Sequence, residues 1–268
     1  MDLIGAFVTN ISQVDEVKKF SSAVGFKPDA LEEFTEYLNA IDNELIAVPV
    51  IDDYFYHDTT GEYTNVPKVR LVEAINNSSY TGRLVFMFDE PFWRVRNHHS
   101  DNRIHEQTFE TLTQIINDYD EFEFAHIEAY AELYKQQQEF GAYKLLLNAK
   151  HIGFDCYGGF YGCSDREDVP LIPQETYLYR IYASILEGGS NAKLFLVPGI
   201  SNTLTGDAYV DDEELLTQFY EYINFYNNNR HIVSSIGAFA WGDYNVTVGA
   251  RSSPAIRAVL KHEFQKLT

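Results

Sequence analysis

The stretch that decides the fold, Arg83–Trp93, reads Arg-Leu-Val-Phe-Met-Phe-Asp-Glu-Pro-Phe-Trp. Its apolar run, Leu84–Phe88, shows no polar alternation, which is typical of a parallel strand buried on both faces. Pro91 ends the strand because it has no N–H to donate to a neighbouring strand. Asp89 and Glu90 therefore lie where the chain leaves the core, the position at which α/β barrels and open sheets place their chemistry. The alternative is that these acids only solvate a strand end or cap the next helix.

Strand-like and helix-like segments alternate along the whole chain. Besides the first stretch, strands are predicted at Leu3–Val8, Leu45–Ile51, Phe122–Tyr130, His151–Tyr157, Lys193–Val197 and Ile236–Trp241. The alternation predicts a parallel sheet with right-handed crossovers. Seven strands are clear, and the eighth is either a short strand near Val24–Lys27 or missing. The fold class predicted over residues 1–268 is one α/β domain, a (β/α)8 TIM-like barrel, regular or irregular.

Composition narrows the classes of partner. The chain has 20 basic and 40 acidic residues and a formal net charge of -20 at pH 7. Nucleic acids and anionic membrane surfaces would be repelled, so a neutral or cationic partner is expected. Aromatic residues make up 15% of the chain, which suits a neutral polyhydroxylated ligand that stacks on exposed rings, although most of these rings belong to the core. The absence of G-x-G-x-x-G and of a phosphate-binding Gly-Lys-Ser/Thr motif weakens nucleotide-binding functions.

The sequence gives little sign of targeting or of cysteine chemistry. No apolar run approaches the length that crosses a bilayer, and the start Met-Asp-Leu-Ile lacks the basic region of a signal peptide. We therefore expect a cytoplasmic protein, or an exported one whose signal has been removed. Cys156 and Cys163 are too few for a disulfide scaffold or a zinc site. Reduced thiols are expected, with a local disulfide as the alternative if the protein is exported.

Acidic residues stand at the carboxyl ends of four predicted strands, namely Asp89 with Glu90, Glu128, Asp155 and Asp243. In a barrel these ends meet at one face, so acids that are distant in sequence become neighbours. Closely grouped carboxylates cannot all ionise comfortably, and the pKa of one of them rises. A protonated carboxyl beside an ionised one is the arrangement that hydrolysis of a glycosidic bond needs. The pattern therefore predicts a hydrolase of oligo- or polysaccharides.

Several side chains at strand ends and in loops are candidates to bind the sugar. Flat rings stack on sugar faces, and the candidate rings are Trp93, Trp241, Tyr54, Tyr56, Tyr130 and Tyr157. Asp89 and Asp243 are candidates to bind substrate hydroxyls. Arg94 is a candidate to hold hydroxyls or a substrate carboxylate, with a solvated loop position as the alternative.

The motif Phe88-Asp89-Glu90-Pro91 resembles the Asn-Glu-Pro that ends the fourth strand of the retaining TIM-barrel glycoside hydrolases. Trp241, within Phe-Ala-Trp-Gly, resembles the Trp that those enzymes carry at the end of the eighth strand. The resemblance implies Glu90 as the general acid and Trp241 as a platform for the sugar. The chain departs from the family's pattern at two places. Asp89 replaces the Asn, and the strand Lys193–Gly199 ends in Pro-Gly where the family has its nucleophilic Glu.

The second carboxylate must then come from Asp155 or Glu128. We favour Asp155 as base or nucleophile and Glu128 as a substrate-binding or pKa-tuning partner. No metal or other cofactor is expected, because the sequence has no H-x-H or H-E-x-x-H spacing.

Two alternatives to this hydrolase stay open. His126, Glu128, Asp89 and Asp155 offer mixed nitrogen and oxygen ligands, which would suit a metal-dependent barrel hydrolase or isomerase. A barrel that binds carbohydrate without catalysis is the other alternative, and the missing acid on the Lys193 strand supports it.

Overall fold

The computed structural model describes residues 2–99, 103–156, 173–200, 202–203, 211–243 and 247–268. Eight parallel strands form one sheet in the order β3-β2-β1-β11-β9-β8-β7-β6. They are β1 (Leu3–Val8), β2 (Ala23–Phe26), β3 (Ile46–Pro49), β6 (Val85–Asp89), β7 (Glu123–Ala129), β8 (His151–Cys156), β9 (Lys193–Pro198) and β11 (Val233–Ala238). The predicted barrel is confirmed, and β2 is its eighth strand.

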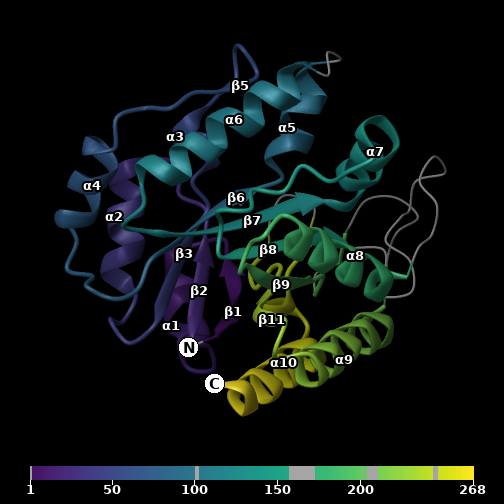
Figure 1. Cartoon of the computed structure of the whole chain (residues 1–268). Coiled ribbons are helices and arrows are strands. Elements are labelled where there is room, and N and C mark those ends of the chain that lie inside the picture. The colour runs from purple at the N-terminus through teal and green to yellow at the C-terminus, as the bar shows by residue number, and fades with distance from the viewer. Residues whose placement is uncertain (1, 100–102, 157–172, 201, 204–210, 244–246) are drawn as a thin grey trace.

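Helices cover the outside of the strands, with α2 and α4 on one side and α9 and α10 on another (Figure 1). The helices are α1 (Val14–Val17), α2 (Leu31–Ala40), α3 (Asp52–Phe55), α4 (Val69–Asn76), α5 (Pro91–His98), α6 (Arg103–Asp118), α7 (Tyr130–Phe140), α8 (Gln174–Glu187), α9 (Asp212–Asn228) and α10 (Pro254–Leu267). Two 3-10 turns, η1 (Ile11–Gln13) and η2 (Ala250–Ser252), lie beside α1 and α10. Two small ladders pair β4 (Tyr56–His57) with β5 (Glu62–Tyr63), and β10 (Asn202–Thr203) with β12 (Thr247–Val248).

One helix begins earlier than its sequence pattern predicts. The periodicity predicts a helix over about Gln136–Ala149, whereas α7 spans Tyr130–Phe140. Gly141 ends α7 because it adopts a left-handed conformation with φ 66°, which is favourable for glycine at a helix C-terminus. None of the helices in the described ranges is long and apolar enough to cross a membrane.

The strands bury both of their faces, as the apolar run in β6 predicts. Val85 and Met87 belong to an apolar cluster that fills the inside of the barrel. Phe86 and Phe88 belong to a larger cluster between the barrel and its helices. Because successive side chains point to opposite faces of a strand, this alternation decides which side chains at the carboxyl ends can reach the mouth.

The barrel closes where β3 meets β6, through isolated bridges rather than a full ladder. The bridges join Ala47 to Leu84 and Val50 to Met87. The Tyr80 hydroxyl bridges the two sides of this seam at its amino end. It lies 2.6 Å from the carbonyl oxygen of Leu45 and 2.7 Å from the carbonyl oxygen of Arg83. The backbone N–H of Ala47 also donates to the Tyr80 hydroxyl at 3.1 Å.

We expect the Tyr80→Phe substitution to lower the free energy of unfolding by about 1–3 kcal/mol, because it leaves buried backbone groups of both strands without their shared partner. Tyr179→Phe is the matched control, since the Tyr179 side chain is exposed, and it should change the free energy by less than about 0.5 kcal/mol. Urea denaturation at equilibrium measures both. Equal stabilities of the two variants would show that the Tyr80 hydroxyl does not hold the seam.

Candidate active site

The carboxyl ends of the strands surround a cavity of about 400 Å³, which we call the mouth. Apolar side chains from the strand ends form its floor, namely Phe7, Val50, Met87, Ile127, Val197 and Phe239. Polar side chains that line it include Asp89 at the end of β6 and Asp53 on α3. The mouth therefore combines an apolar floor with a charged wall, which is typical of sites that bind small molecules.

Glu90 and Asp155 meet beside Asp89, although 64 residues lie between them in the sequence. Glu90 follows β6 directly, Asp155 lies near the end of β8, and their side chains are joined by a hydrogen bond. Two carboxyl groups can share such a bond only when one of them carries a proton. The predicted meeting of acids from separate strands at one rim therefore occurs for this pair.

Burial and neighbouring acids raise the pKa of Glu90 far above its ordinary value. Burial contributes most, followed by the negative charges of Asp155 and Asp89, with a smaller effect from Glu128. Glu90 therefore holds its proton at neutral pH. Its backbone is left-handed at φ 52°, an uncommon conformation for a residue other than glycine and one that occurs often at functional sites.

Asp52 and Asp89 extend this acidic group along the seam. Asp52 is fully buried and accepts hydrogen bonds from the Tyr63 hydroxyl at 2.5 Å and from the backbone N–H of Asp89 at 2.8 Å. Burial raises the pKa of Asp52 to about 6. Burial, followed by the charges of Asp52 and Asp155, raises the pKa of Asp89 to about 7. The acids at the carboxyl ends of β3 and β6, Asp52 and Asp89, thus titrate near neutrality.

The two cations at this end of the barrel are already paired with Asp53. Arg94 Nη1 lies 2.5 Å from Asp53 Oδ1, and Lys27 Nζ lies 3.3 Å from Asp53 Oδ2. Arg94 also pairs with Asp58 at 3.2 Å and covers the ring of Tyr56, with 4.0 Å between the guanidinium carbon and the ring centroid. Arg94 is therefore held by two protein acids, and its predicted role in binding substrate stays a prediction. Sequence reasoning missed Lys27 because it left the strand before this residue undecided.

Glu128 does not reach the mouth. Ile127 lines the mouth, so the next side chain points outward, where Glu128 is fully buried beneath α5. Its carboxylate accepts the backbone N–H groups of Phe92 at 3.0 Å, Trp93 at 3.3 Å and Ala129 at 2.9 Å. The prediction of a catalytic or substrate-binding Glu128 is therefore wrong, because the side chain caps the N-terminus of α5. What remains is its electrostatic effect on Glu90.

His126 also points outward, and the arrangement does not favour a metal. Its ring is fully buried, and its Nδ1 accepts the backbone N–H of Leu146 at 3.3 Å. Burial lowers the pKa of His126 to about 3, so the imidazole is neutral. Within the described part of the chain, no group of three or more His, Cys, Asp or Glu side chains is arranged to hold a metal ion.

Three of the predicted sugar platforms, Trp241, Tyr130 and Tyr56, are buried core residues. Trp241 is fully buried in the outer apolar cluster, with its ring centroid 5.1 Å from that of Phe20, so the predicted platform role is wrong. Tyr130 is 4% exposed and packs edge-on against Tyr177 at 4.6 Å, which also removes it from the mouth. Trp241 and Tyr130 both belong to the apolar cluster between the barrel and its helices, so neither ring faces the mouth.

The other predicted binding residues have different surroundings. Trp93 on α5 is half-buried, with the Lys135 ammonium 5.2 Å from its ring centroid. Asp243 accepts the backbone N–H of Gly249 at 2.9 Å and the Ser252 hydroxyl at 3.0 Å, so it stabilises the chain after β11. Tyr157 and Cys163 lie outside the described residues, as does the side chain of Cys156.

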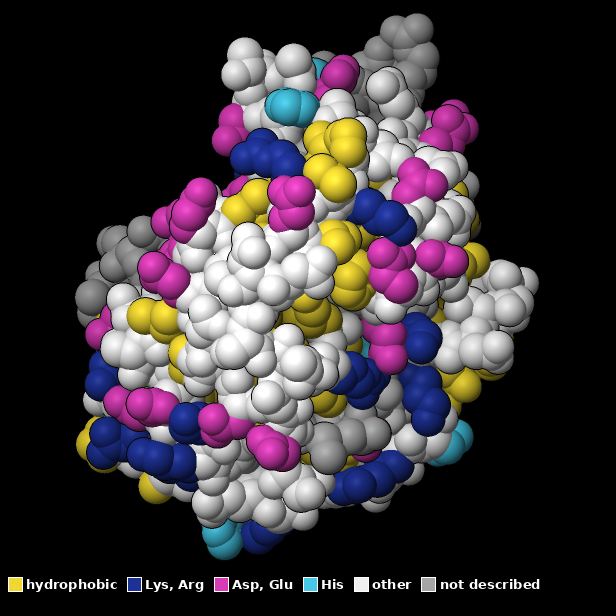
Figure 2. Space-filling model, turned by 90° about the vertical axis from the view of Figure 1, so that its left-hand side faces the viewer, with side chains coloured by type: hydrophobic (Ala, Val, Ile, Leu, Met, Phe, Trp, Pro, Cys, Tyr) yellow, Lys and Arg dark blue, Asp and Glu magenta, His cyan; other side chains and the backbone are white. Residues whose placement is uncertain are grey.

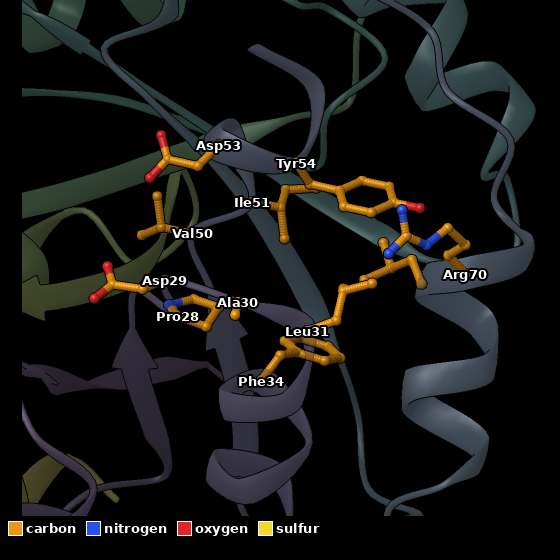
Figure 3. A pocket seen from close by; sticks show the side chains of 11 residues that line it. Pro28, Asp29, Ala30, Leu31, Phe34, Val50, Ile51, Asp53, Tyr54 and Arg70 are labelled. Carbon is orange, nitrogen blue, oxygen red and sulfur yellow. The ribbon is translucent and has the colours of Figure 1, made fainter. Parts of the chain in front are cut away.

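Tyr54 lines a second cavity of about 170 Å³ beside the mouth (Figure 3). The two cavities share Asp29, Val50 and Asp53. In Figure 3 the carboxylates of Asp29 and Asp53 lie at one end of this side pocket, and Tyr54 and Arg70 lie at the other. The side pocket thus extends the mouth toward α4.

The comparisons with known proteins show the fold. A scan of protein-family models and a search of curated proteins give no match. Among solved structures, a triple mutant of an endo-β-1,4-glucanase from Xanthomonas axonopodis pv. citri superimposes with a TM-score of 0.58 at 11% identity, over 99% of this chain and 100% of that chain. A group II chitinase catalytic domain from Ostrinia furnacalis gives 0.57 at 8% identity, over 98% and 96% of the two chains.

A modular endo-β-1,4-mannanase from Cellulomonas fimi, described with glycoside hydrolase family 26, gives a TM-score of 0.53 at 12% identity. The alignment covers 95% of this chain, which spans 64% of the length of the mannanase. The chain therefore has the TIM-barrel fold that these glycoside hydrolases share.

The raised pKa of Asp52 should make the free energy of unfolding depend on pH. Because the pKa is raised from 3.8 to about 6 on folding, the folded state keeps a proton that the unfolded chain releases. This contribution to stability is fully present below about pH 4 and is lost as the pH rises through about 6, and it amounts to at most about 3 kcal/mol. We expect Asp52→Asn to reduce the loss of unfolding free energy between pH 4 and 7, as measured by urea denaturation.

Asp120→Asn is the control, because Asp120 is exposed and should keep the pH dependence of the parent protein. An Asp52→Asn variant with the same pH dependence as the parent would contradict a proton held at Asp52.

Proposed function

We propose that this protein is a glycoside hydrolase that cleaves an oligo- or polysaccharide, with Glu90 as the general acid and Asp155 as the second carboxylate. The observation that carries the proposal is the hydrogen bond between these two side chains at the carboxyl ends of β6 and β8, together with the raised pKa of Glu90. A protonated and an ionised carboxyl in one site are the two groups that glycosidic hydrolysis requires. The fold shared with glucanase, mannanase and chitinase structures supports the class of reaction.

In the proposed reaction Glu90 donates its proton to the leaving oxygen as the bond from that oxygen to the anomeric carbon breaks. Asp155, as the anion, stabilises the positive charge that develops on the sugar ring. It then acts either as the nucleophile at the anomeric carbon or as the base that takes a proton from the attacking water. Substrate entering between the two carboxyls replaces their mutual hydrogen bond. If Asp155 is the nucleophile, a water breaks its bond to the anomeric carbon and gives its proton to Glu90. If Asp155 is the base, the proton that it takes from water returns to Glu90 when the products leave.

Two further features support Asp155 in this role. Strand β9, where the retaining family places its nucleophilic Glu, ends in Pro198, and the side chain of β9 that lines the mouth is Val197. Asp155 lies on the adjacent strand, paired with Val197 in register, and its negative charge acts on both Glu90 and Asp89. In this proposal Asp89, which lines the mouth, tunes the proton affinity of the pair and binds substrate hydroxyls.

We expect Glu90→Gln and Asp155→Asn each to reduce the release of reducing sugar by about 10²–10⁴-fold, because each removes one partner of the acid and base pair. Panels of β-1,4-linked glucan, mannan and chitin oligosaccharides are the first substrates to assay. Glu110→Gln, at an exposed position on α6, is the matched control and should keep the parent activity. Parent-like turnover in the Glu90→Gln variant would exclude Glu90 as the acid.

A barrel that binds carbohydrate without cleaving it is the second candidate. The observation that favours it is the end of β9, where the mouth is lined by Val197 rather than by an acid. Oligosaccharide binding by the parent protein, measured by calorimetry, with no release of reducing sugar would support this candidate over the hydrolase.

A further inference from the structure

One wall of the mouth is built from three side chains spaced four residues apart, Asp29, Glu33 and Tyr37. Glu33 and Tyr37 lie on α2, and Asp29 stands just before its first turn. Residues separated by four positions lie on the same face of a helix, one above the other. The apolar spacing of Leu31, Phe34, Tyr37 and Leu38 predicts the helix, but the pattern alone does not show that Tyr37 borders the mouth.

The carboxylates of Asp29 and Glu33 have no cation beside them among the described residues. Lys27 and Arg94, the nearest basic side chains of the mouth, form ion pairs with Asp53 instead. Figure 3 shows the Asp29 carboxylate at the opposite end of the side pocket from Arg70. Glu33 uses one oxygen to accept the backbone N–H of Asp29 at 2.6 Å, which leaves its other oxygen available to a ligand.

Tyr37 provides the second, independent observation. Its side chain is 2% exposed, and its ring stacks on Phe26 with 4.6 Å between the centroids and 15° between the planes. Tyr37 is one of the residues that line the mouth, and no hydrogen bond between described residues involves its hydroxyl. A polar side chain that is almost completely buried, has no protein partner and borders a cavity is available to a ligand in that cavity.

We propose that this wall binds the ammonium group of an amino sugar, so that the substrate is an oligosaccharide containing 2-amino-2-deoxy sugar residues. A primary ammonium has three N–H donors and no acceptor, and Asp29, Glu33 and Tyr37 supply three acceptors with two negative charges. A neutral sugar hydroxyl has one donor and leaves the charges uncompensated. The formal net charge of -20 also favours a cationic substrate over an anionic one. This inference rests on the proposed carbohydrate function and adds the class of sugar.

Isothermal calorimetry with three matched ligands tests the inference, namely β-1,4-linked hexamers of glucosamine, N-acetylglucosamine and glucose. At about pH 5.5 the sugar amine is protonated, because amino groups of this kind have pKa values well above that. We expect the glucosamine hexamer to bind at least about tenfold more tightly than the other two, since a hydrogen bond assisted by charge contributes about 1.5–3 kcal/mol. The preference should shrink as the salt concentration rises.

The variants Glu33→Gln and Tyr37→Phe should weaken binding of the glucosamine hexamer about tenfold and change binding of the glucose hexamer by less than about threefold. Glu36→Gln removes a charge from the exposed face of the same helix and is the matched control, with parent-like binding expected. Circular dichroism and thermal melts confirm that the variants fold.

Equal affinity of the parent protein for the three hexamers, binding of none of them, or equal weakening of all three by Glu33→Gln would overturn the inference. Its failure is distinguishable from failure of the hydrolase proposal. Cleavage of neutral glycans without a preference for the amino sugar would contradict only the ammonium site. Preferential binding of the glucosamine hexamer without turnover would contradict only the hydrolase.

Discussion

The alternation of side chains along parallel strands is the constraint on which the site depends. In β6 and β7 the side chains of Met87, Asp89 and Ile127 point to the mouth, and those of Phe88 and Glu128 point to the helices. Because neighbouring positions on a strand point to opposite faces, an acid at one position lies at the mouth, whereas an acid at the next position contacts a helix. Glu90 reaches the site from beyond the strand, where its left-handed backbone changes the direction of the chain before α5.

The fold could be predicted from the sequence because the alternation of strands and helices can be recognised without knowing in which direction each side chain points. The run Leu84–Phe88 is buried on both faces as predicted. The same property explains the errors at Glu128 and Trp241. A strand that is apolar on both sides carries no pattern that tells inside from outside, so sequence alone could not show that both side chains lie behind the barrel wall. The short strand β2 was uncertain because four residues give too weak a pattern.

The residues that give the mouth its charge come from short segments rather than from motifs. Asp52 and Asp53 belong to a one-turn helix, which is too short to leave a periodic pattern in the sequence. Lys27 and Arg94 pair with Asp53 and not with the acids on either side of it, so negative charge remains both beside Glu90 and at the α2 wall. Elsewhere, acidic and basic side chains are interspersed, as on the face of the molecule in Figure 2.

The seam between β3 and β6 is the part of the barrel wall that is joined by isolated bridges and not by a full ladder. Its backbone hydrogen bonds include those from Ala47 N–H to the Arg83 oxygen and from Ile51 N–H to the Met87 oxygen, both at 3.0 Å. At the carboxyl end the Asp52 side chain replaces the missing ladder by accepting the Asp89 N–H. Because the pKa of Asp52 is about 6, the strength of this hydrogen bond from the Asp89 N–H depends on pH. The closure of the barrel and the protonation of the acids at its carboxyl end are thereby linked through one carboxyl group.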